Sequence, residues 1–378
     1  MRSNSSRAAS PLVLLVLCAA AAASDAAAPA AGTSAARYYT LADFQHVDKI
    51  DAHVHVHGRA ERFMAQAIAD GFRILTINVD SPDHPPIGEQ QLAAVSLRER
   101  YPGRVAFAAT FSVEGFQSPG WGAAALQQID DAVAHGAVGV KMWKNIGMTL
   151  RDTDGSYVMP DDARLEPIIA HLEREHIVLL GHQAEPRNCW LSLAQMTIRS
   201  DREYFREHPQ YYMHEHPEMP TQAAILAARD RMLHAHPELR FDGVHLASLE
   251  WDVDRVADFL DRFPNADVDM AARLVHLEYQ SASDRQKVRR FLIRYQDRIL
   301  YGSDAAYGPE EADAAEIATL HADWLQDWRF LVTSERMHSD DFDAGFRGLR
   351  LPRAVVDKIY GRNAERLFAS AWDAPQTR

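Results

Sequence analysis

The chain has 378 residues, of which 47% are hydrophobic and 25% are charged, a composition typical of folded globular domains and unlike that of disordered or fibrous chains. Its formal net charge of -13 at pH 7 argues against a surface for nucleic acids or anionic membranes. At this length the chain can form either two small domains or one α/β barrel.

The N-terminus has the features of a secretory signal peptide over residues 1–25. Arg2 and Arg7 precede an apolar run from Pro11 to Ala23, and small residues follow this run. A basic start, a short apolar core and an Ala-x-Ala-like exit are the parts of such a signal, and the run is too short to span a membrane comfortably. We therefore expect an exported protein, periplasmic or secreted, with no membrane attachment after cleavage.

Residues 26–45 have the composition of a spacer, because the first part of this segment is rich in Ala, Gly, Ser and Pro. The chain contains two cysteines, Cys18 and Cys189. If Cys18 leaves with the signal peptide, no internal disulfide can form, although an exported protein meets oxidising conditions. A lone cysteine is usually a small buried hydrophobe, and this is our interpretation of Cys189.

From about residue 46 to residue 370, short β-branched runs alternate with amphipathic helical segments. The sequence predicts strands over His46–Val56, Arg73–Val79, Val105–Phe111, Val138–Trp143, Ile177–His182, Arg240–His245, Ala266–Met270 and Arg298–Ser303. The helical period is clearest over Leu92–Tyr101, Ala123–His135, Asp162–Glu175, Val253–Phe263, Asp284–Tyr295 and Arg353–Phe368. Strands that alternate with helices in this number predict an α/β fold, a (β/α)8 TIM barrel; an open, doubly wound sheet is the alternative.

Two long segments interrupt this alternation, residues 187–239 after the fifth predicted strand and residues 304–350 after the eighth. The first is partly helical, with Gln222–His234 as its clearest helix, and the second is rich in Trp and Asp. In a barrel, both would be insertions at the C-terminal face, where the active sites of such barrels lie. Functional side chains are therefore expected at the C-terminal ends of the strands.

The first predicted strand carries two histidines, His53 and His55, separated by one residue. Because side chains alternate between the two faces of a strand, both imidazoles point to the same side and form half of a transition-metal site. Asp51 faces the same side, deeper in the barrel, and we expect it to orient one of these histidines. His57 continues the alternation into the loop, where it is either a bystander or a substrate contact.

Three later strands each end in another ligand-type side chain: His182, His245 and Asp304. A single histidine at a strand end is more often a hydrogen-bonded structural residue. A set distributed over four strand ends is poorly explained by coincidence, because all of these ends lie at the same face of the predicted barrel.

These side chains resemble the metal and catalytic constellation of the amidohydrolase superfamily: His53, His55, His182, His245 and Asp304. Within it, the chain is most similar to the amidohydrolase-related branch, which contains aminocarboxymuconate-semialdehyde decarboxylase and its relatives. The closing segment Ile359–Phe368 resembles the C-terminal helix of that branch and its Gly-x-Asn-Ala-x-Arg-Leu pattern. The resemblance covers about residues 46–370.

The resemblance implies one divalent metal, held by His53, His55, His182 and Asp304. Zinc is the default for such ligands, and manganese or iron would suit them as well. His245 is then either an additional ligand or an acid/base group beside the metal. We expect the second role, because an imidazole that titrates near neutral pH can stabilise an oxyanion or deliver a proton. Asp304 would both bind the metal and act as the base for the metal-activated water.

Three further side chains near strand ends are candidates for substrate binding. Lys141 is a cation for a substrate carboxylate or carbonyl, a carboxylated lysine that bridges two metals as in some superfamily members, or an uninvolved lysine that reaches solvent. Arg273 would clamp an anionic substrate, with a structural ion pair as the alternative. Trp143 would line a pocket for a ring or an acyl chain, with ordinary packing as the alternative.

Together with the resemblance, these residues predict a metal-dependent hydrolase that uses metal-activated water on an amide, lactone or ester carbonyl of a small substrate. Non-oxidative decarboxylation of a small unsaturated or aromatic acid is the first alternative, because relatives in the same branch perform it with nearly the same ligands. A non-catalytic metal-binding barrel is the second alternative. The expected partner is a small-molecule substrate, and the resemblance is compatible with a homodimer.

Overall fold

The structure is a computed structural model that describes residues 37–369 and 371–372. The predicted signal peptide, residues 1–25, and the start of the predicted spacer lie outside the described residues. None of the described helices combines the length and the apolar character needed to cross a membrane.

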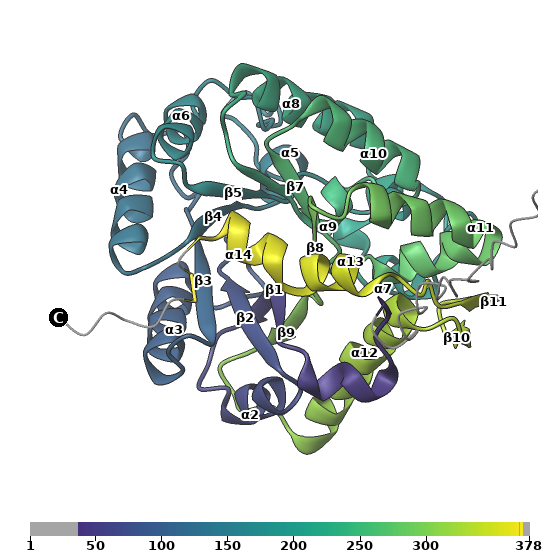
Figure 1. Cartoon of the computed structure of the whole chain (residues 1–378). Helices are drawn as coiled ribbons and strands as arrows, with labels where there is room; N and C mark the ends of the chain where they lie inside the picture. The colour runs from purple at the N-terminus through teal and green to yellow at the C-terminus, as the bar shows by residue number, and fades with distance from the viewer. Residues whose placement is uncertain (1–36, 370, 373–378) are drawn as a thin grey trace, which may run out of the picture.

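The architecture is the predicted TIM barrel, built from parallel strands that pair in chain order (Figure 1). The strands are β1 (Lys49–Val56), β2 (Phe72–Ile77), β3 (Val105–Thr110), β4 (Gly139–Met142), β5 (Val178–Gly181), β6 (Phe241–Gly243), β7 (Ala266–Asp269), β8 (Ile299–Leu300) and β9 (Ala305–Tyr307). All of the predicted strands are confirmed. They lie in buried, nearly continuous apolar runs because helices cover the outside of a parallel sheet.

The barrel closes through an interrupted eighth strand. β8 pairs with β7, whereas β9 pairs with β1. Between them, Ala52 N donates to Tyr301 O (2.9 Å) and Asp304 N donates to His53 O (2.8 Å). The open, doubly wound sheet is therefore excluded, since the last strand returns to the first.

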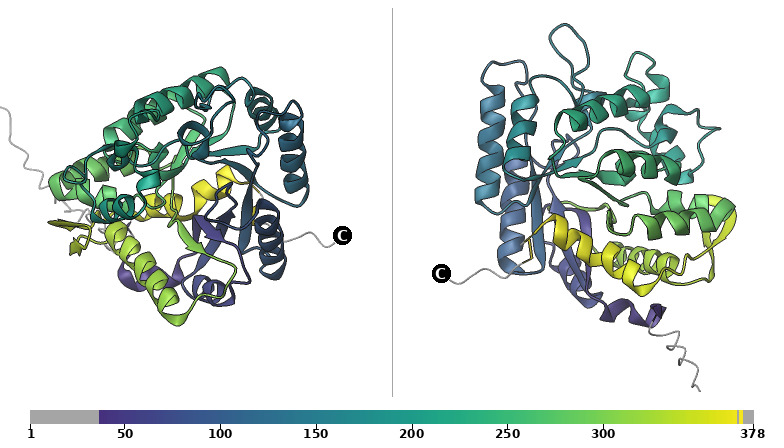
Figure 2. Two further views of the ribbon diagram at one scale, coloured as in Figure 1. Left: turned by 180° about the vertical axis from the view of Figure 1, so that it is seen from behind. Right: turned by 45° about the horizontal axis from the view of Figure 1, so that its top comes forward.

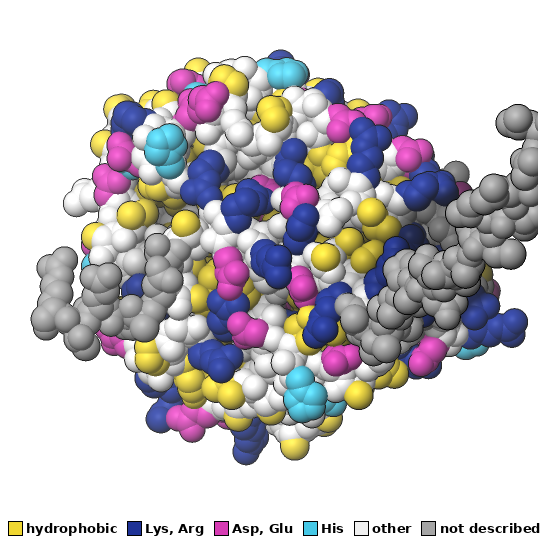
Figure 3. Space-filling view, in the orientation of Figure 1, with side chains coloured by type: hydrophobic (Ala, Val, Ile, Leu, Met, Phe, Trp, Pro, Cys, Tyr) yellow, Lys and Arg dark blue, Asp and Glu magenta, His cyan; other side chains and the backbone are white. Residues whose placement is uncertain are grey.

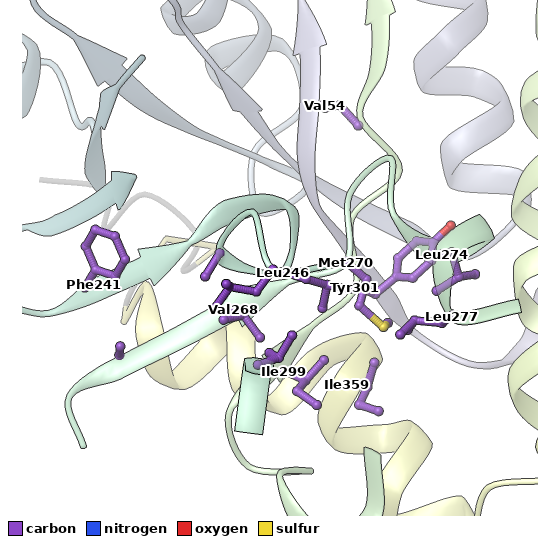
Figure 4. Packing of buried hydrophobic residues seen from close by; sticks show 14 of the residues in the cluster. Val54, Phe241, Leu246, Val268, Met270, Leu274, Leu277, Ile299, Tyr301 and Ile359 are labelled. Atoms are coloured by element: carbon purple, nitrogen blue, oxygen red, sulfur yellow. The ribbon is translucent and has the colours of Figure 1, made fainter. Parts of the chain in front are cut away.

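Each strand of the barrel except β8, which is followed by β9, leads to an outer helix, and the helices surround the strands (Figure 2). In chain order they are α2 (Glu61–Ala69), α3 (Ile87–Arg100), α4 (Trp121–Ala134), α6 (Glu166–Arg174), α8 (Gln222–Ala235), α10 (Val253–Arg262), α11 (Leu274–Arg294) and α12 (Ala314–Val332). Their apolar faces pack on the sheet and bury side chains such as Phe63, Leu172 and Phe259. Figure 4 shows part of this core, where Val268 and Ile299 of neighbouring strands lie near Ile359 of the C-terminal segment.

The C-terminal segment covers the N-terminal end of the barrel. It runs as α13 (Arg353–Asp357), a π-helical turn η5 (Lys358–Arg362) and α14 (Asn363–Leu367) across that end (Figure 1). Asn363 Nδ2 donates to the carbonyls of Gln296 (2.8 Å) and Ile299 (2.7 Å) and so fixes the segment to the start of β8. On the face seen in Figure 3, basic and acidic side chains are interspersed. The opposite, C-terminal end is the face at which the active sites of such barrels lie.

The two long segments contain elements of the barrel itself as well as additions. Residues 187–239 hold η2 (Arg187–Trp190), α7 (Arg199–Glu207), η3 (Pro209–Tyr211) and η4 (Met213–Glu215) before the barrel helix α8. Residues 304–350 hold β9 and α12, followed by an antiparallel hairpin of β10 (Arg336–Ser339) and β11 (Phe342–Arg347). The additions meet where Arg199 N donates to Asp341 O (3.0 Å). The inserted parts are thus shorter than the sequence predicts.

The folded body begins before residue 46. The 3-10 helix η1 (Leu41–His46) buries Phe44, and the Tyr39 hydroxyl donates to Asp357 Oδ1 (2.6 Å). Trp328 Nε1 donates to Thr40 O (3.0 Å). Residues 39–45 are therefore not part of a spacer. The Ala-rich composition of the preceding segment gives no hint of these aromatic anchors.

Candidate metal centre

The histidines and the aspartate predicted from the sequence meet at the C-terminal end of the barrel. They come from β1 (His53, His55), from the residue after β5 (His182), from the turn α9 (Val244–Ala247) after β6 (His245), and from the link between β8 and β9 (Asp304). Because the parallel strands end at one rim of the barrel, residues far apart in the chain become neighbours there.

Three of these side chains form one compact group of metal-ligating atoms. A ring nitrogen of His53, a ring nitrogen of His245 and a carboxylate oxygen of Asp304 all lie within 4.8 Å of one another. The distance from His53 Nε2 to Asp304 Oδ1 is 3.4 Å. We call His53, His245 and Asp304 the inner triad.

His55 and His182 flank the inner triad. His55 Nε2 lies 3.3 Å from Asp304 Oδ1. The His182 ring is edge-on to the His245 ring, with centroids 4.4 Å apart, and His182 Nε2 is buried without a hydrogen-bond partner among the described residues. The predicted ligands and His245 are therefore brought together. We expected His245 to be an acid/base group beside the metal. Its ring nitrogen instead lies among the ligand atoms of the inner triad.

Hydrogen bonds at Nδ1 set the orientation of three of the imidazoles. In each case Nδ1 donates to an oxygen: His53 to Asp269 Oδ2 (2.6 Å), His55 to Ile77 O (2.7 Å) and His245 to Ala271 O (2.8 Å). A ring nitrogen that faces a carbonyl or a carboxylate carries the proton, so the lone pair of Nε2 is left for the site. The imidazoles are thus prepared as metal ligands.

Asp269, at the end of β7, orients the His53 ring, a role that the sequence does not predict. Its Oδ1 accepts from the backbone N–H groups of His245 (2.7 Å) and Ala271 (3.1 Å). Asp269 is the last residue of β7, and its place at the C-terminal end of a strand is the signal that could identify it from the sequence. Asp269 therefore holds two ligands of the cluster at once.

Asp51 does not orient a histidine ring, contrary to our expectation. Its carboxylate accepts from Ser303 N (2.9 Å), Trp324 Nε1 (2.9 Å) and, more weakly, His53 N (3.3 Å). Alternation along the strand predicts the face on which Asp51 lies but not its partners across the barrel. Its contacts position the backbone of β1 and of the segment that leads to Asp304.

Burial keeps three histidines of the cluster, His53, His182 and His245, neutral. It lowers the pKa of His53, and it lowers those of His182 and His245 well below their usual value, with the Lys141 charge acting in the same direction. His245 therefore does not titrate near neutral pH in the protein alone, which corrects our expectation. Its Nε2 is available as a ligand or as a proton acceptor.

Asp304 has the opposite charge state. Burial opposes its ionisation, but His245, His55 and His53 hold the pKa of Asp304 well below its ordinary range, so it is a carboxylate at pH 7. The centre therefore combines neutral imidazoles with one anionic ligand, the donor types that a divalent transition metal requires.

Two residues of the inner triad have left-handed backbone conformations. The φ angles are 60° at His245 and 69° at Asp304, and the left-handed run continues from Leu246 through Ser248. Such conformations cost about 1–3 kcal/mol each in non-glycine residues and persist where surrounding contacts hold them. The hydrogen bonds of the two backbone N–H groups, to Asp269 and to the carbonyl of His53, provide that hold.

Lys141, on β4, lies inside the cluster. Its Nζ is 3.2 Å from His53 Nε2, and its side chain is buried, so the alternative of an uninvolved lysine that reaches solvent is wrong. Burial lowers the pKa of Lys141 to about 8, against the opposing influence of Asp304 and Asp269. An ammonium and a metal cannot share one lone pair, so metal binding at His53 requires Lys141 to take another partner.

Arg273 reaches the same region after β7. Its charge contributes to the lowered pKa values of His182 and His245, after the effect of burial. Nη1 donates to Ala272 O (3.0 Å), Nε is buried without a partner, and no described carboxylate forms an ion pair with the guanidinium. The structural ion pair considered as the alternative is therefore absent among the described residues.

Trp143 lines a hollow that includes none of the candidate metal ligands. It lines a space of about 500 Å³ at the ends of β2, β3 and β4, together with Asp80, Ser112 and Asn145. None of these residues belongs to the inner triad. The structure therefore does not place Trp143 against the candidate metal ligands.

A second group of imidazoles lies beside the first. Ring nitrogens of His55, His57 and His84 all lie within 4.8 Å of one another, and we call these residues the outer triad. Burial lowers the pKa of His57 to about 3 and that of His84 to about 4. No role for His84 is predicted from the sequence, although a ligand-type residue in the loop after the second strand lies at the correct face.

One family of known proteins matches most of the chain. Residues 50–369 match the family described as amidohydrolase. Among curated proteins, none matches the sequence.

Solved structures share the fold. The uncharacterized TIM-barrel protein Bb4693 from Bordetella bronchiseptica is 15% identical, with a TM-score of 0.51, over 86% of this chain and 99% of that one. A 2,6-dihydroxybenzoate decarboxylase from Rhizobium is 15% identical, with a TM-score of 0.50, over 85% of this chain and 98% of that one. A 2,6-dihydroxybenzoate decarboxylase complexed with 2,6-dihydroxybenzoate is 14% identical, with a TM-score of 0.51, over 85% and 99%. At these identities the likeness supports the fold alone.

Proposed function

Because the chain belongs to the amidohydrolase family, we propose that it is a metal-dependent hydrolase that uses activated water on an amide, lactone or ester carbonyl of a small substrate. The observation that carries the proposal is the way in which the histidine rings are oriented and protonated. Three imidazoles present Nε2 around the Asp304 carboxylate, and each is held at Nδ1 by an oxygen acceptor. This arrangement has a use in metal binding and none that we can identify in ordinary core packing.

The donor set fits a divalent metal. His53, His55, His182 and Asp304 would hold it, and zinc is the first expectation, with manganese or iron compatible with the same ligands. His182 Nε2, buried without a partner, is costly to desolvate, and a bond to a metal would offset that cost. A divalent metal supplies Lewis acidity and lowers the pKa of a water molecule toward neutrality.

The residues of the chain would then handle protons and substrate charge. Asp304, ionised at pH 7, would orient the attacking water and accept its proton first. His245, with a neutral Nε2 beside Asp304, would take that proton on and deliver it to the leaving group. The two groups lie within 4.8 Å of each other through their ligand atoms, so the transfer needs only a small movement.

Lys141 and Arg273 would bind the substrate. Lys141, displaced from His53 by a metal, would turn to the carbonyl oxygen on which negative charge develops. Arg273, which has no described carboxylate within ion-pair distance although its charge acts on Asp201 and Glu250, would bind an anionic group of the substrate through two N–H donors. A substrate that carries a carboxylate beside the bond to be cleaved is therefore favoured.

Decarboxylation of a small unsaturated or aromatic acid is the second candidate. The two buried cations favour it, because they would hold a substrate carboxylate next to the metal ligands. Hydrolysis and decarboxylation share the same ligands and differ in which bond of the substrate breaks.

A substrate panel that measures both outcomes tests the proposal. The protein loaded with zinc, manganese or iron is incubated with amides, lactones, esters and unsaturated or aromatic acids, and cleavage products and carbon dioxide are both quantified. Cleavage that disappears in Asp304→Asn and persists in the exposed control His135→Ala supports hydrolysis. Carbon dioxide release without cleavage replaces hydrolysis with decarboxylation. Bound metal without turnover on any compound supports a non-catalytic barrel.

A further inference from the structure

We propose that the outer triad, His55, His57 and His84, binds a second transition-metal ion at the rim of the barrel. This site is separate from the inner triad and uses no lysine bridge. It goes beyond the proposed function, because neither hydrolysis nor decarboxylation as described above requires it.

The positions of the rings suit a shared ion. The ring centroid of His84 lies 5.4 Å from that of His55 and 5.1 Å from that of His57, and the His55 and His57 centroids are 6.2 Å apart. The ligand nitrogens lie within 4.8 Å of one another. Zinc–nitrogen bonds of about 2.0–2.1 Å in a tetrahedron place ligand nitrogens about 3.3 Å apart. Rotation of the rings can close this difference.

The buried ring of His57 is independent evidence for a bound ion. The residue is 6% exposed, and both ring nitrogens are buried with no hydrogen-bond partner among the described residues. His84 Nδ1 is buried and unpartnered as well. Leaving such a group unsatisfied costs about 1–3 kcal/mol, and an ion that binds one nitrogen of each ring would relieve this cost at both histidines.

The backbone holds these histidines where a metal would need them. His57 N donates to Tyr307 O (3.0 Å), which fixes the end of β1 against β9. His84 lies in a short loop whose turn is closed by His84 N donating to Ser81 O (3.2 Å). The imidazoles therefore approach each other from two anchored segments.

The chemistry of the donors selects the kind of ion. Three imidazoles without a carboxylate among the ligand atoms favour zinc, copper, nickel or iron over magnesium or calcium, which prefer oxygen ligands. Three protein ligands also leave a coordination position open, as in catalytic rather than structural zinc sites. That open position would accept an anionic group of an entering substrate.

His55 is the point where the two sites compete. With one ion at the inner site, His55 Nε2 faces Asp304 and serves that ion, as in the proposed function. With both ions bound, His55 serves the outer ion and leaves His53, His182, His245 and Asp304 for the inner one. Each ion then retains at least three protein ligands.

Metal stoichiometry tests the outer site without reference to activity. Purified protein is stripped with a chelator, dialysed against zinc or cobalt at fixed free concentration, and analysed by plasma mass spectrometry. We expect two equivalents in the unaltered protein and in the exposed control His135→Ala. We expect one equivalent in His57→Ala and in His84→Ala.

Further variants distinguish the outer site from a lysine-bridged centre and from a loss of folding. His57→Asn and His84→Asn should lose the same equivalent as the alanine variants, with thermal unfolding measured to confirm folding. His53→Ala should lose the inner equivalent and keep the outer one. If the second equivalent is lost in Lys141→Gln but kept in the His57 and His84 variants, it belongs to a lysine-bridged centre and the outer site is overturned.

The remaining outcomes are equally decisive. One equivalent in every protein, or two in every His57 and His84 variant, overturns the outer site. A third outcome is that the unaltered protein binds one equivalent of metal and only the His57 and His84 variants lose it. This outcome supports the outer site and overturns the inner site, and with it the proposed function. The two hypotheses therefore fail independently.

Discussion

The substitution Asp269→Asn should move the proton of His53 from Nδ1 to Nε2 while leaving the side chains of the candidate metal centre in place. In the native chain, Asp269 Oδ2 accepts from His53 Nδ1 at 2.6 Å, and Oδ1 accepts from the backbone N–H groups of His245 and Ala271. The asparagine oxygen can keep both backbone hydrogen bonds, so its amide nitrogen must face His53. An N–H donor there forces the proton of His53 onto Nε2, which removes the lone pair from the site.

The expected loss of metal affinity is 10- to 100-fold, the usual effect of removing a residue that orients a metal-ligating histidine. This corresponds to about 1.4–2.7 kcal/mol at 1.36 kcal/mol per tenfold change. Because Asp269 and His53 are both fully buried, water cannot replace the lost acceptor. The reduction should therefore lie nearer the upper end of this range.

The assay is a competition between the protein and a chelating dye for zinc at constant pH. Asp267→Asn, on the same strand, is the matched control, because Asp267 pairs with Arg366 away from the histidines. The control should unfold at a lower denaturant concentration and bind zinc with unchanged affinity. An Asp269→Asn affinity within twofold of the native value, or an equal loss in both variants, would refute the reasoning about the His53 proton.

Three further predictions concern substrate binding, pH and the closed end of the barrel. Burial raises the pKa of Glu278 from 4.5 to about 8, so the folded chain binds the extra proton between these values and stability falls as pH rises through this range. Glu278→Gln should therefore raise the free energy of unfolding, measured in urea, by at most about 5 kcal/mol at pH 9 and by far less at pH 5. The control Glu99→Gln, at an exposed position, should change the free energy of unfolding at neither pH. Arg273→Met should raise KM about 10- to 100-fold for an acidic substrate and leave a neutral analogue unaffected; an equal effect on both would exclude anion binding by this side chain. Asn363→Ala leaves two carbonyl groups without their donor and should lower the free energy of unfolding by about 1–3 kcal/mol with zinc affinity unchanged, as urea titration and dye competition would show.

The main features of the barrel are predictable from the sequence. Apolar runs that alternate with helical periods predict the strands β1 to β8, because burial on both faces of a parallel sheet leaves a clear mark on composition. The chain between Ile299 and Tyr307 is harder to predict, since it leaves the regular strand conformation around Asp304. The anchoring of Tyr39 is also invisible in the sequence, because its partners Asp357 and Trp328 lie near the opposite end of the chain.

For the site, the order of residues along the chain is enough to predict that the candidate metal ligands and His245 meet, but not that Asp269 and His84 join them. Period-two alternation puts His53 and His55 on one face, and the parallel barrel carries His182, His245 and Asp304 to the same rim. Which atoms face each other there is settled by the folded barrel. The acceptor at each Nδ1, the contact of Lys141 with His53 and the approach of His84 to His57 depend on residues far apart in the chain and on loop conformations that no sequence period encodes. The neutral state of His245 likewise follows from burial, a property of the folded barrel and not of the histidine itself.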